Sequence, residues 1–171
     1  MFHPSGPTTS RRTARISTER VLLSLLLLSA GCATGAPAPA ESDAATAVPA
    51  MLRASAEDWN RGDLNGFLDD YLDSPETAFV GSDVSFGVDE IRARYLRSYW
   101  SMGRPEGLLS FEDIHVRPLG SDHALARGRY VLKDRSTNRQ TSTGMFTLVL
   151  VRTADAWRII HDHSSESPPQ N

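Results

Sequence analysis

Four long β-strands are predicted one after another in the C-terminal half of the chain, and this feature limits the possible folds most. Apolar and polar residues alternate along these segments, and each break between them holds turn residues such as Pro118-Leu119-Gly120. Long strands that are joined by short turns pair as antiparallel neighbours. The four strands are expected at about 108–117, 123–133, 142–152 and 156–164.

Three helices and two short strands are expected before these long strands. The first helix has apolar residues at helical spacing from Leu52 to Trp59, and the second follows Asp63 as its N-cap. In chain order, these elements are a helix that ends at Gly62, a helix over 64–72, strands at 77–80 and 83–86, and a helix that follows Gly87.

This order, α-α-β-β-α-β-β-β-β, predicts an α+β fold. Strands of this length curve, so we expect a cone-shaped, strongly curved and mostly antiparallel sheet with the three helices packed on its concave face. Helices that cover only part of a curved sheet leave an open mouth, and such a mouth is a common place for a ligand pocket.

The N-terminus predicts export. Four arginines precede a short apolar run and small residues, the order found in secretory signals, and Cys32 follows directly. A cysteine at this place resembles the lipobox of bacterial lipoproteins, which implies that residues 1–31 are a cleaved lipoprotein signal peptide and that Cys32 is lipidated. Ala33 after Cys32 resembles the outer-membrane sorting pattern, so the expected location is the outer membrane, facing the periplasm. Since Cys32 is the only cysteine, no disulfide forms within the mature chain.

Composition then divides the exported chain. Residues 32–49 contain Val48 as their only large aliphatic side chain and cannot offset the entropy of ordering, so we expect a disordered Ala/Pro tether. A single compact domain is expected over 50–166, followed by a disordered tail over 167–171.

The charge of the mature chain excludes one class of partner. Removal of residues 1–31 takes four of the 18 Lys and Arg residues and one of the 21 Asp and Glu residues, which leaves a net charge of about −6. Nucleic-acid binding needs clustered Lys and Arg to neutralise phosphates. We therefore expect no nucleic acid as a partner.

Three stretches resemble the nuclear transport factor 2-like superfamily, and more narrowly its SnoaL-like and kinase-association-domain-like members. The resemblance implies the cone fold but no particular activity, because the superfamily includes isomerases, cyclases, dehydratases and non-enzymes. It also implies homodimers that pack sheet to sheet. The three stretches are residues 59–67, residues 87–95, and residues 146–152 together with 157–165.

The last strand contains the main site candidates. With period-two alternation, Trp157, Ile159, His161 and His163 share one face, which in similar family members lines the inside of the cone. Two imidazoles there would bind a polar or anionic ligand or transfer protons, whereas the alternative is that they are structural, hydrogen-bonded groups. No third metal ligand is identifiable beside them, so we expect neither a metal nor another cofactor.

Other candidates lie on the third helix and on the second long strand. Tyr95 and Tyr99 have polar tips and are expected in the pocket, although core packing is the alternative at helical spacing. Arg127 and Arg129 face either the pocket or a dimer interface, and this choice stays open. The strand at 145–151 is apolar on both faces, so its outer face is expected to meet a second copy.

Three functions remain open. The favoured one is a membrane-tethered domain that binds a small polar or anionic ligand without turnover. The second is a SnoaL-like or ketosteroid isomerase-like enzyme (isomerase, dehydratase or cyclase) that uses His161 or His163 as acid–base. Ketosteroid isomerase-like members have a general-base aspartate where this chain has Ala78 or Phe79, which speaks against that mechanism. The third is a dimeric scaffold with an unused pocket.

Overall fold

The computed structural model of the protein describes residues 43–168. The predicted signal peptide, Cys32 and the tail from residue 169 onward lie outside the described residues. The elements are α1 (Ala44–Arg61), α2 (Leu64–Leu68), β1 (Ala78–Val80), β2 (Val84–Phe86), α3 (Val88–Ser98), β3 (Trp100–Ser101), β4 (Arg104–Pro105), β5 (Gly107–Pro118), β6 (His123–Asp134), β7 (Gln140–Arg152) and β8 (Trp157–Glu166).

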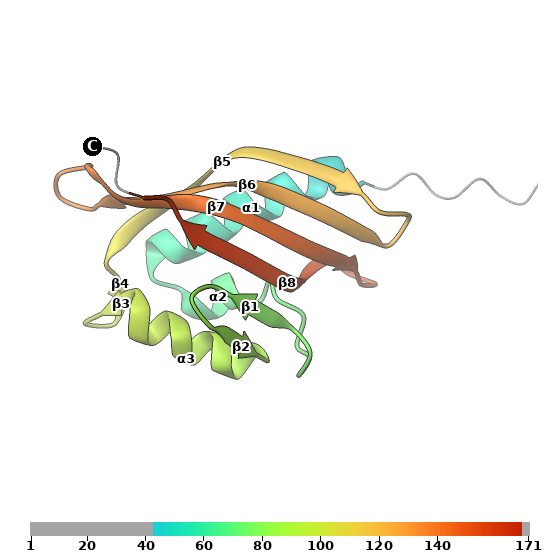
Figure 1. Cartoon of the computed structure of the whole chain (residues 1–171), viewed down its shortest axis with the longest axis horizontal. Coiled ribbons are helices and arrows are strands. Elements are labelled where there is room, and N and C mark those ends of the chain that lie inside the picture. Colours follow the sequence, from blue (N-terminus) through green and yellow to red (C-terminus); the bar gives the residue numbers. More distant parts are fainter. Residues whose placement is uncertain (1–42, 169–171) are drawn as a thin grey trace, which may run out of the picture. The chain divides into compact units, whose positions relative to one another are not determined.

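The sheet has six strands in the order β2-β1-β8-β7-β6-β5. Every pair is antiparallel except β1 with β8, so the sheet is mixed. Helix α1 crosses behind the long strands, and α3 lies beside β1 and β2 (Figure 1). The predicted α+β class with a curved, mostly antiparallel sheet is confirmed. The β3–β4 pair is an addition that the sequence did not predict.

Helix α1 begins at Ala44, earlier than the expected domain start at residue 50. Ala44 and Val48 have no exposed surface, so this first part of the helix is packed into the core and is not a free tether. Polar contacts also hold the start of α1 to the sheet, because the Trp157 Nε1–H donates to Asp43 Oδ1 at 2.9 Å.

Helix α2 ends at Leu68, earlier than the expected end at residue 72, because the chain that follows pairs with β8. The Leu72 N–H donates to the Ile159 carbonyl at 2.8 Å, and the Ile159 N–H donates to the Asp70 carbonyl at 2.8 Å. These bonds hold Tyr71 in extended backbone, so that its side chain points into the interior.

The C-terminal end of α1 is fixed to β5 by the indole of Trp59 and the side-chain amide of Asn60. The Trp59 Nε1–H donates to the Gly107 carbonyl at 3.0 Å. The side-chain amide of Asn60 bonds the backbone of Leu109 as a paired strand would. Its Nδ2 donates to the Leu109 carbonyl at 3.0 Å, and its Oδ1 accepts from the Leu109 N–H at 2.7 Å. The helix is thereby held over the concave face, with space left between it and the strands. Within residues 43–168, none of the helices has the length and apolar character needed to cross a bilayer.

We expect Val48→Ala to lower the free energy of unfolding by about 1.5 kcal/mol, because it removes two methyl groups from a fully buried position. Urea denaturation of the full chain measures this change. Ala50→Ser, at an exposed position of the same helix, is the control and should change stability by less than about 0.5 kcal/mol. Equal, small effects of both variants would show that residues 44–49 form a tether after all.

Candidate functional site

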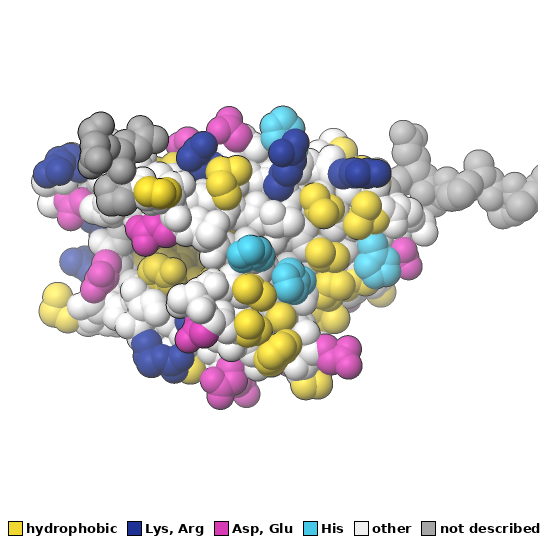
Figure 2. All heavy atoms as spheres, viewed as in Figure 1, with side chains coloured by type: hydrophobic (Ala, Val, Ile, Leu, Met, Phe, Trp, Pro, Cys, Tyr) yellow, Lys and Arg dark blue, Asp and Glu magenta, His cyan; other side chains and the backbone are white. Residues whose placement is uncertain are grey.

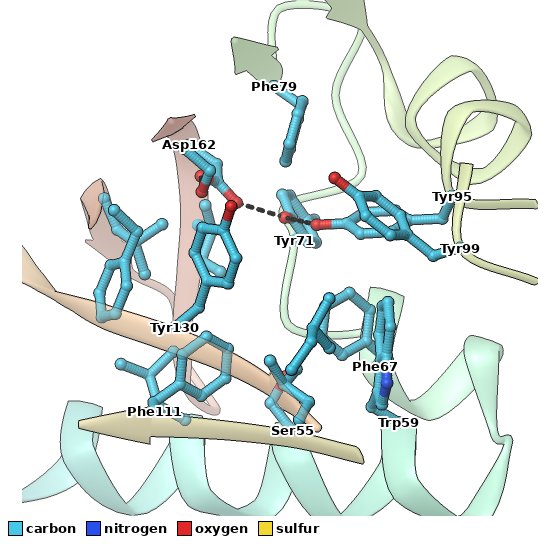
Figure 3. Close-up of a pocket in the computed structure, with 17 residues that line it drawn as sticks. Ser55, Trp59, Phe67, Tyr71, Phe79, Tyr95, Tyr99, Phe111, Tyr130 and Asp162 are labelled. Atoms are coloured by element: carbon cyan, nitrogen blue, oxygen red, sulfur yellow. Dashed lines mark hydrogen bonds between the residues drawn. The ribbon is translucent and has the colours of Figure 1, made fainter. Parts of the chain in front are cut away.

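An aromatic chamber lies between the three helices and the concave face of the sheet (Figure 3). Its volume is about 70 Å³, and nine of its lining side chains are aromatic, including all four tyrosines of the chain. Among the described residues that line it, none is Lys, Arg or His. The chamber is lined by Leu52, Ser55, Trp59, Phe67, Tyr71, Phe79, Tyr95, Tyr99, Leu109, Phe111, Tyr130, Leu132, Phe146, Leu148, Ile159, Asp162 and Ser164.

The chamber adjoins a wider cavity of about 700 Å³, which we call the mouth. Residues shared by both cavities form the boundary, among them Phe79, Tyr99, Tyr130 and Leu132. The mouth is more polar than the chamber, with Arg94, Glu106, Asp134 and Glu166 among its lining residues. Figure 2 shows a hollow of this kind, with apolar side chains inside it and charged side chains around it.

Two glycines give the aromatic rings their room on the concave face. Tyr130 is paired across the strands with Gly144, and Phe146 is paired with Gly128. A Cβ on Gly144 would lie 2.6 Å from the Tyr130 ring, and a Cβ on Gly128 would lie 2.6 Å from the Phe146 ring. Each ring therefore lies against bare backbone and leaves the chamber open, which a side chain at either glycine would prevent.

A chain of hydroxyl groups ends on a buried carboxylate inside the chamber. The Tyr71 hydroxyl donates to Asp162 Oδ2 at 2.7 Å, and the Ser164 hydroxyl donates to Asp162 Oδ1 at 2.8 Å. The Tyr95 and Tyr71 hydroxyl oxygens are 3.1 Å apart. Since Tyr71 has given its only proton to Asp162, Tyr95 must donate to Tyr71. The Tyr95 oxygen then has no proton left to give and acts toward the chamber as an acceptor.

Burial sets the ionisation of these groups. Desolvation raises the pKa of Asp162, while the hydrogen bonds from Tyr71 and Ser164 and the nearby histidines, His161 and His163, act in the opposite direction. Desolvation also raises the pKa of Tyr71 and of Tyr95 well above the usual value, so both phenols stay neutral. Asp162 is therefore the acidic group of the chamber, and burial raises its pKa.

The prediction that His161 and His163 line the cone is wrong, because a β-bulge reverses the alternation in β8. Val149 pairs with His161 and Leu150 pairs with Ile159, so Ile160 has no partner of its own. Before the bulge, the side chains of Trp157 and Ile159 face the interior. After the bulge, the side chain of Asp162 faces the interior. Both histidines are exposed on the outer face of the sheet.

The other predicted site residues are divided between the chamber and the core. Tyr95 and Tyr99 both line the chamber. Trp157 is buried, but it lies away from the chamber and its indole binds Asp43. Arg127 and Arg129 face outward, since the alternating residues of β6 (Ala126 and Gly128 among them) are the buried ones.

Asp162 and Tyr71 are functional candidates that the sequence reasoning missed. The adjacent pair Ile159-Ile160 breaks the alternation of β8 and was the available signal for a bulge. Tyr71 lies within the helix expected over 64–72, and nothing local in the sequence shows that this segment pairs with β8. Within residues 43–168, no group of three or more His, Cys, Asp or Glu side chains is placed to hold a metal ion.

The cone fold with an interior chamber defines the nuclear transport factor 2-like class of proteins. A sequence profile described as the SnoaL-like domain matches residues 48–169. The chain belongs to the SnoaL-like family. No protein of curated function matches the sequence.

Solved structures agree with this assignment. An NTF-2 like protein of unknown function from Shewanella oneidensis MR-1 is 31% identical, with a TM-score of 0.60 over 69% of this chain and 95% of that chain. A ketosteroid isomerase-like protein from Erwinia carotovora atroseptica SCRI1043 is 18% identical, with a TM-score of 0.57 over 75% and 100%. A protein from Thiobacillus denitrificans ATCC 25259, named for the association domain of calcium/calmodulin-dependent protein kinase type II, is 18% identical, with a TM-score of 0.60 over 71% and 96%. The last two share the fold alone.

Proposed function

We propose that the domain binds a small molecule whose compact hydrogen-bonding head enters the chamber while its larger apolar body occupies the mouth. The observation that carries this proposal is the Tyr95–Tyr71–Asp162 chain of hydrogen bonds inside an otherwise apolar, aromatic cavity. Ligand sites are typically apolar with a few convergent polar groups, and about 300–1,000 Å³ in size. The mouth has that size, whereas the chamber alone admits only a small group.

The network also selects the chemistry of the head. The Tyr95 oxygen is an acceptor without a free proton, and the Asp162 carboxylate accepts as well. A ligand that donates a hydrogen bond therefore fits better than one that only accepts. The anionic ligand expected from the sequence loses its basis, since the two histidines face outward and the chamber contains a carboxyl group.

We expect benzyl alcohol to bind in the chamber and mouth, because it combines a donating head with an aromatic body. Isothermal titration of the full chain measures the affinity, and NMR locates the site. Leu132→Trp, at the boundary between the two cavities, should weaken binding at least about tenfold. Leu119→Trp, at an exposed position that follows β5 and lines neither cavity, is the matched control and should leave the affinity unchanged. Equal affinities for both variants, or no binding by the unmodified chain, would count against the proposal.

A second candidate is an acid–base enzyme in which Asp162 moves the proton. The observation in its favour is a buried carboxyl group with a raised pKa inside a pocket, an environment that acid–base catalysts commonly have. This alternative replaces His161 or His163 as the acid–base group. If the unmodified chain turns over a bound ligand and Asp162→Asn does not, the enzyme is favoured. If the protein is instead a dimeric scaffold with an unused pocket, neither chain binds a ligand.

We also propose that two copies pair through the outer face of β6–β8. Apolar side chains gather on this face beside histidines (Figure 2). Met145 is 45% exposed, and Val149, Val151 and Ile160 remain partly exposed in the single chain. A surface of this kind is typical of a contact with another protein.

Val149→Asp should convert the dimer into a monomer, because it places an unpaired charge at the centre of the apolar contact. Sedimentation velocity of the full chain at micromolar concentration measures the state. Ala50→Asp, at an exposed position of α1, adds the same charge and should stay dimeric. If the unmodified chain sediments only as a monomer, the interface does not exist in solution.

The cellular setting that we propose is attachment to the bacterial outer membrane through lipidated Cys32. The support is the order of basic, apolar and small residues before this cysteine. Two or more acyl chains anchor a protein stably, whereas one chain holds it only marginally. The pocket would then take its ligand from the periplasm.

A further inference from the structure

The chamber contains an uncompensated acid. Asp162 is only 6% exposed, and the partners of its oxygens are the neutral hydroxyls of Tyr71 and Ser164. Buried carboxylates are usually paired with a cation, because hydroxyl donors replace only part of the lost hydration. Among the described chamber residues no cation is present. A positively charged group from outside the protein would complete this site.

The rest of the chamber wall suits a cation. Aromatic faces carry negative electrostatic potential and attract ammonium groups. In Figure 3, Tyr95 and Tyr99 extend into the chamber from the end of α3, and Tyr130 extends into it from β6. Tyr95 alone contacts Trp59, Phe67, Phe79 and Tyr99 edge-on or tilted, with ring centroids 5.1–5.8 Å apart. The Tyr95 ring is thus packed among aromatic side chains, and its hydroxyl is linked to Asp162 through the Tyr71 hydroxyl.

The mouth favours the same sign of charge. Glu106, Asp134 and Glu166 line it, against one described basic residue, Arg94. Arg94 is already neutralised, since it forms an ion pair with Asp83 and its guanidinium lies 4.7 Å from the centre of the Phe79 ring. A surplus of acidic groups around an opening raises the local concentration of cations.

We propose that the cone binds a small primary amine head first, with its ammonium group donating to the Asp162 carboxylate and to the Tyr95 hydroxyl oxygen. This inference rests on the proposed function and adds the charge of the ligand. About 70 Å³ holds an ammonium and its first carbon, since a water-sized group takes about 30 Å³. An attached apolar body, such as an aromatic ring, then lies in the mouth between Phe79, Tyr99 and Tyr130.

The arrangement makes amine binding depend on pH. Tyr71, Tyr95 and Tyr99 from the helical side and Tyr130 from β6 stay neutral because burial raises the pKa of each. Asp162 must be ionised to attract the ammonium, so the affinity falls as the pH is lowered through its raised pKa. The remaining charged groups that face this end of β8 are Glu166, Arg94 and the two outer-face histidines, His161 and His163.

The test compares benzylamine with benzyl alcohol, which have the same size and differ in the charge of the donating head. Isothermal titration with the full chain at pH 7.5 should show benzylamine binding about tenfold more tightly, because charge-assisted hydrogen bonds are about twice as strong as neutral ones. Asp162→Asn should abolish this preference, so that the two probes bind this variant with equal affinity, because asparagine carries no charge. Lowering the pH should weaken the binding of benzylamine but not of benzyl alcohol. The double variant His161→Gln/His163→Gln should show the same pH dependence.

The outcomes separate this inference from the proposed function. If benzyl alcohol binds as tightly as benzylamine to the unmodified chain, the ammonium site does not exist while the binding function stands. If neither probe binds, both fall. If Asp162→Asn does not fold, the comparison of the two probes on the unmodified chain still tests the ammonium site. Tyr95→Phe is then the second variant, and it should weaken the binding of both probes about tenfold.

Discussion

Gly144→Ala is expected to destabilise the protein by about 3 kcal/mol, the largest effect that a single methyl group should have in this chain. The added Cβ would lie 2.0 Å from the Ser165 carbonyl oxygen and 2.6 Å from the Tyr130 ring. The ring can turn, but the carbonyl belongs to the backbone of β8 and moves only if the end of that strand separates from β7. The substitution therefore strains both the β7–β8 pairing and the wall of the chamber.

Urea denaturation of the full chain measures this loss, and Gln140→Ala at the exposed start of the same strand is the control, with an expected change below about 0.5 kcal/mol. A double-mutant cycle with Tyr130→Leu separates the two contacts. The smaller side chain should recover the part of the loss that comes from the ring and leave the part that comes from Ser165. A loss below about 1 kcal/mol for Gly144→Ala would mean that β7 and β8 are not held at the spacing described.

The long strands were predictable because their signals are local. The segments expected at 108–117 and 123–133 became β5 (Gly107–Pro118) and β6 (His123–Asp134), with ends that differ by one residue at most. Alternation and turn residues determine these strands without help from the rest of the chain. The same is true of α3, whose first turn contains acidic residues and whose inner side contains Ile91 and Tyr95.

The errors have a common physical cause, which is contact between distant segments. Residues 70–72 continue the helical pattern of α2, but hydrogen bonds with Ile159 hold them in extended backbone. Ala44 and Val48 lie in an Ala/Pro-rich stretch that forms helix because the core covers it. Local composition contains no information on either contact.

The site was harder to predict than the fold, because a single extra residue decided it. Period-two alternation from Trp157 correctly places Ile159 inside, and one unpaired residue, Ile160, then moves His161 out and Asp162 in. Of the five predicted pocket residues, Tyr95 and Tyr99 lie in the chamber because α3 was predicted correctly. The hydrogen-bond chain from Tyr95 to Asp162 joins α3, the segment after α2 and β8, and it has no signature in any one of them.

Asp70→Asn is expected to stabilise the protein by about 2 kcal/mol at pH 7 and to have little effect at pH 4. Burial is the main reason that the pKa of Asp70 rises from 3.8 to about 6, against opposing effects of a hydrogen bond from Ser55 and the charge of Arg158. A raised pKa means that the folded state favours the protonated acid. The stabilisation from this group is complete below about pH 4, is lost as the pH rises through about 6, and changes little above about pH 7. A shift of about two units corresponds to about 3 kcal/mol, which we reduce to about 2 because Asp70 is partly exposed.

Asparagine keeps the shape of the aspartate and its ability to bond Ser55, but it has no charge to bury, so the difference between variant and unmodified chain isolates the ionisation of Asp70. Urea denaturation from pH 4 to pH 8 measures it, and Asp162, whose pKa is raised in the same direction, contributes equally to both chains and cancels. Asp69→Asn, at the exposed neighbouring position, is the control and should change stability at pH 7 by less than about 0.5 kcal/mol. A difference for Asp70→Asn that stays constant from pH 4 to pH 8, or that favours the unmodified chain at pH 7, would mean that this carboxylate is well solvated and that the end of the chamber beside Ser55 is open to water.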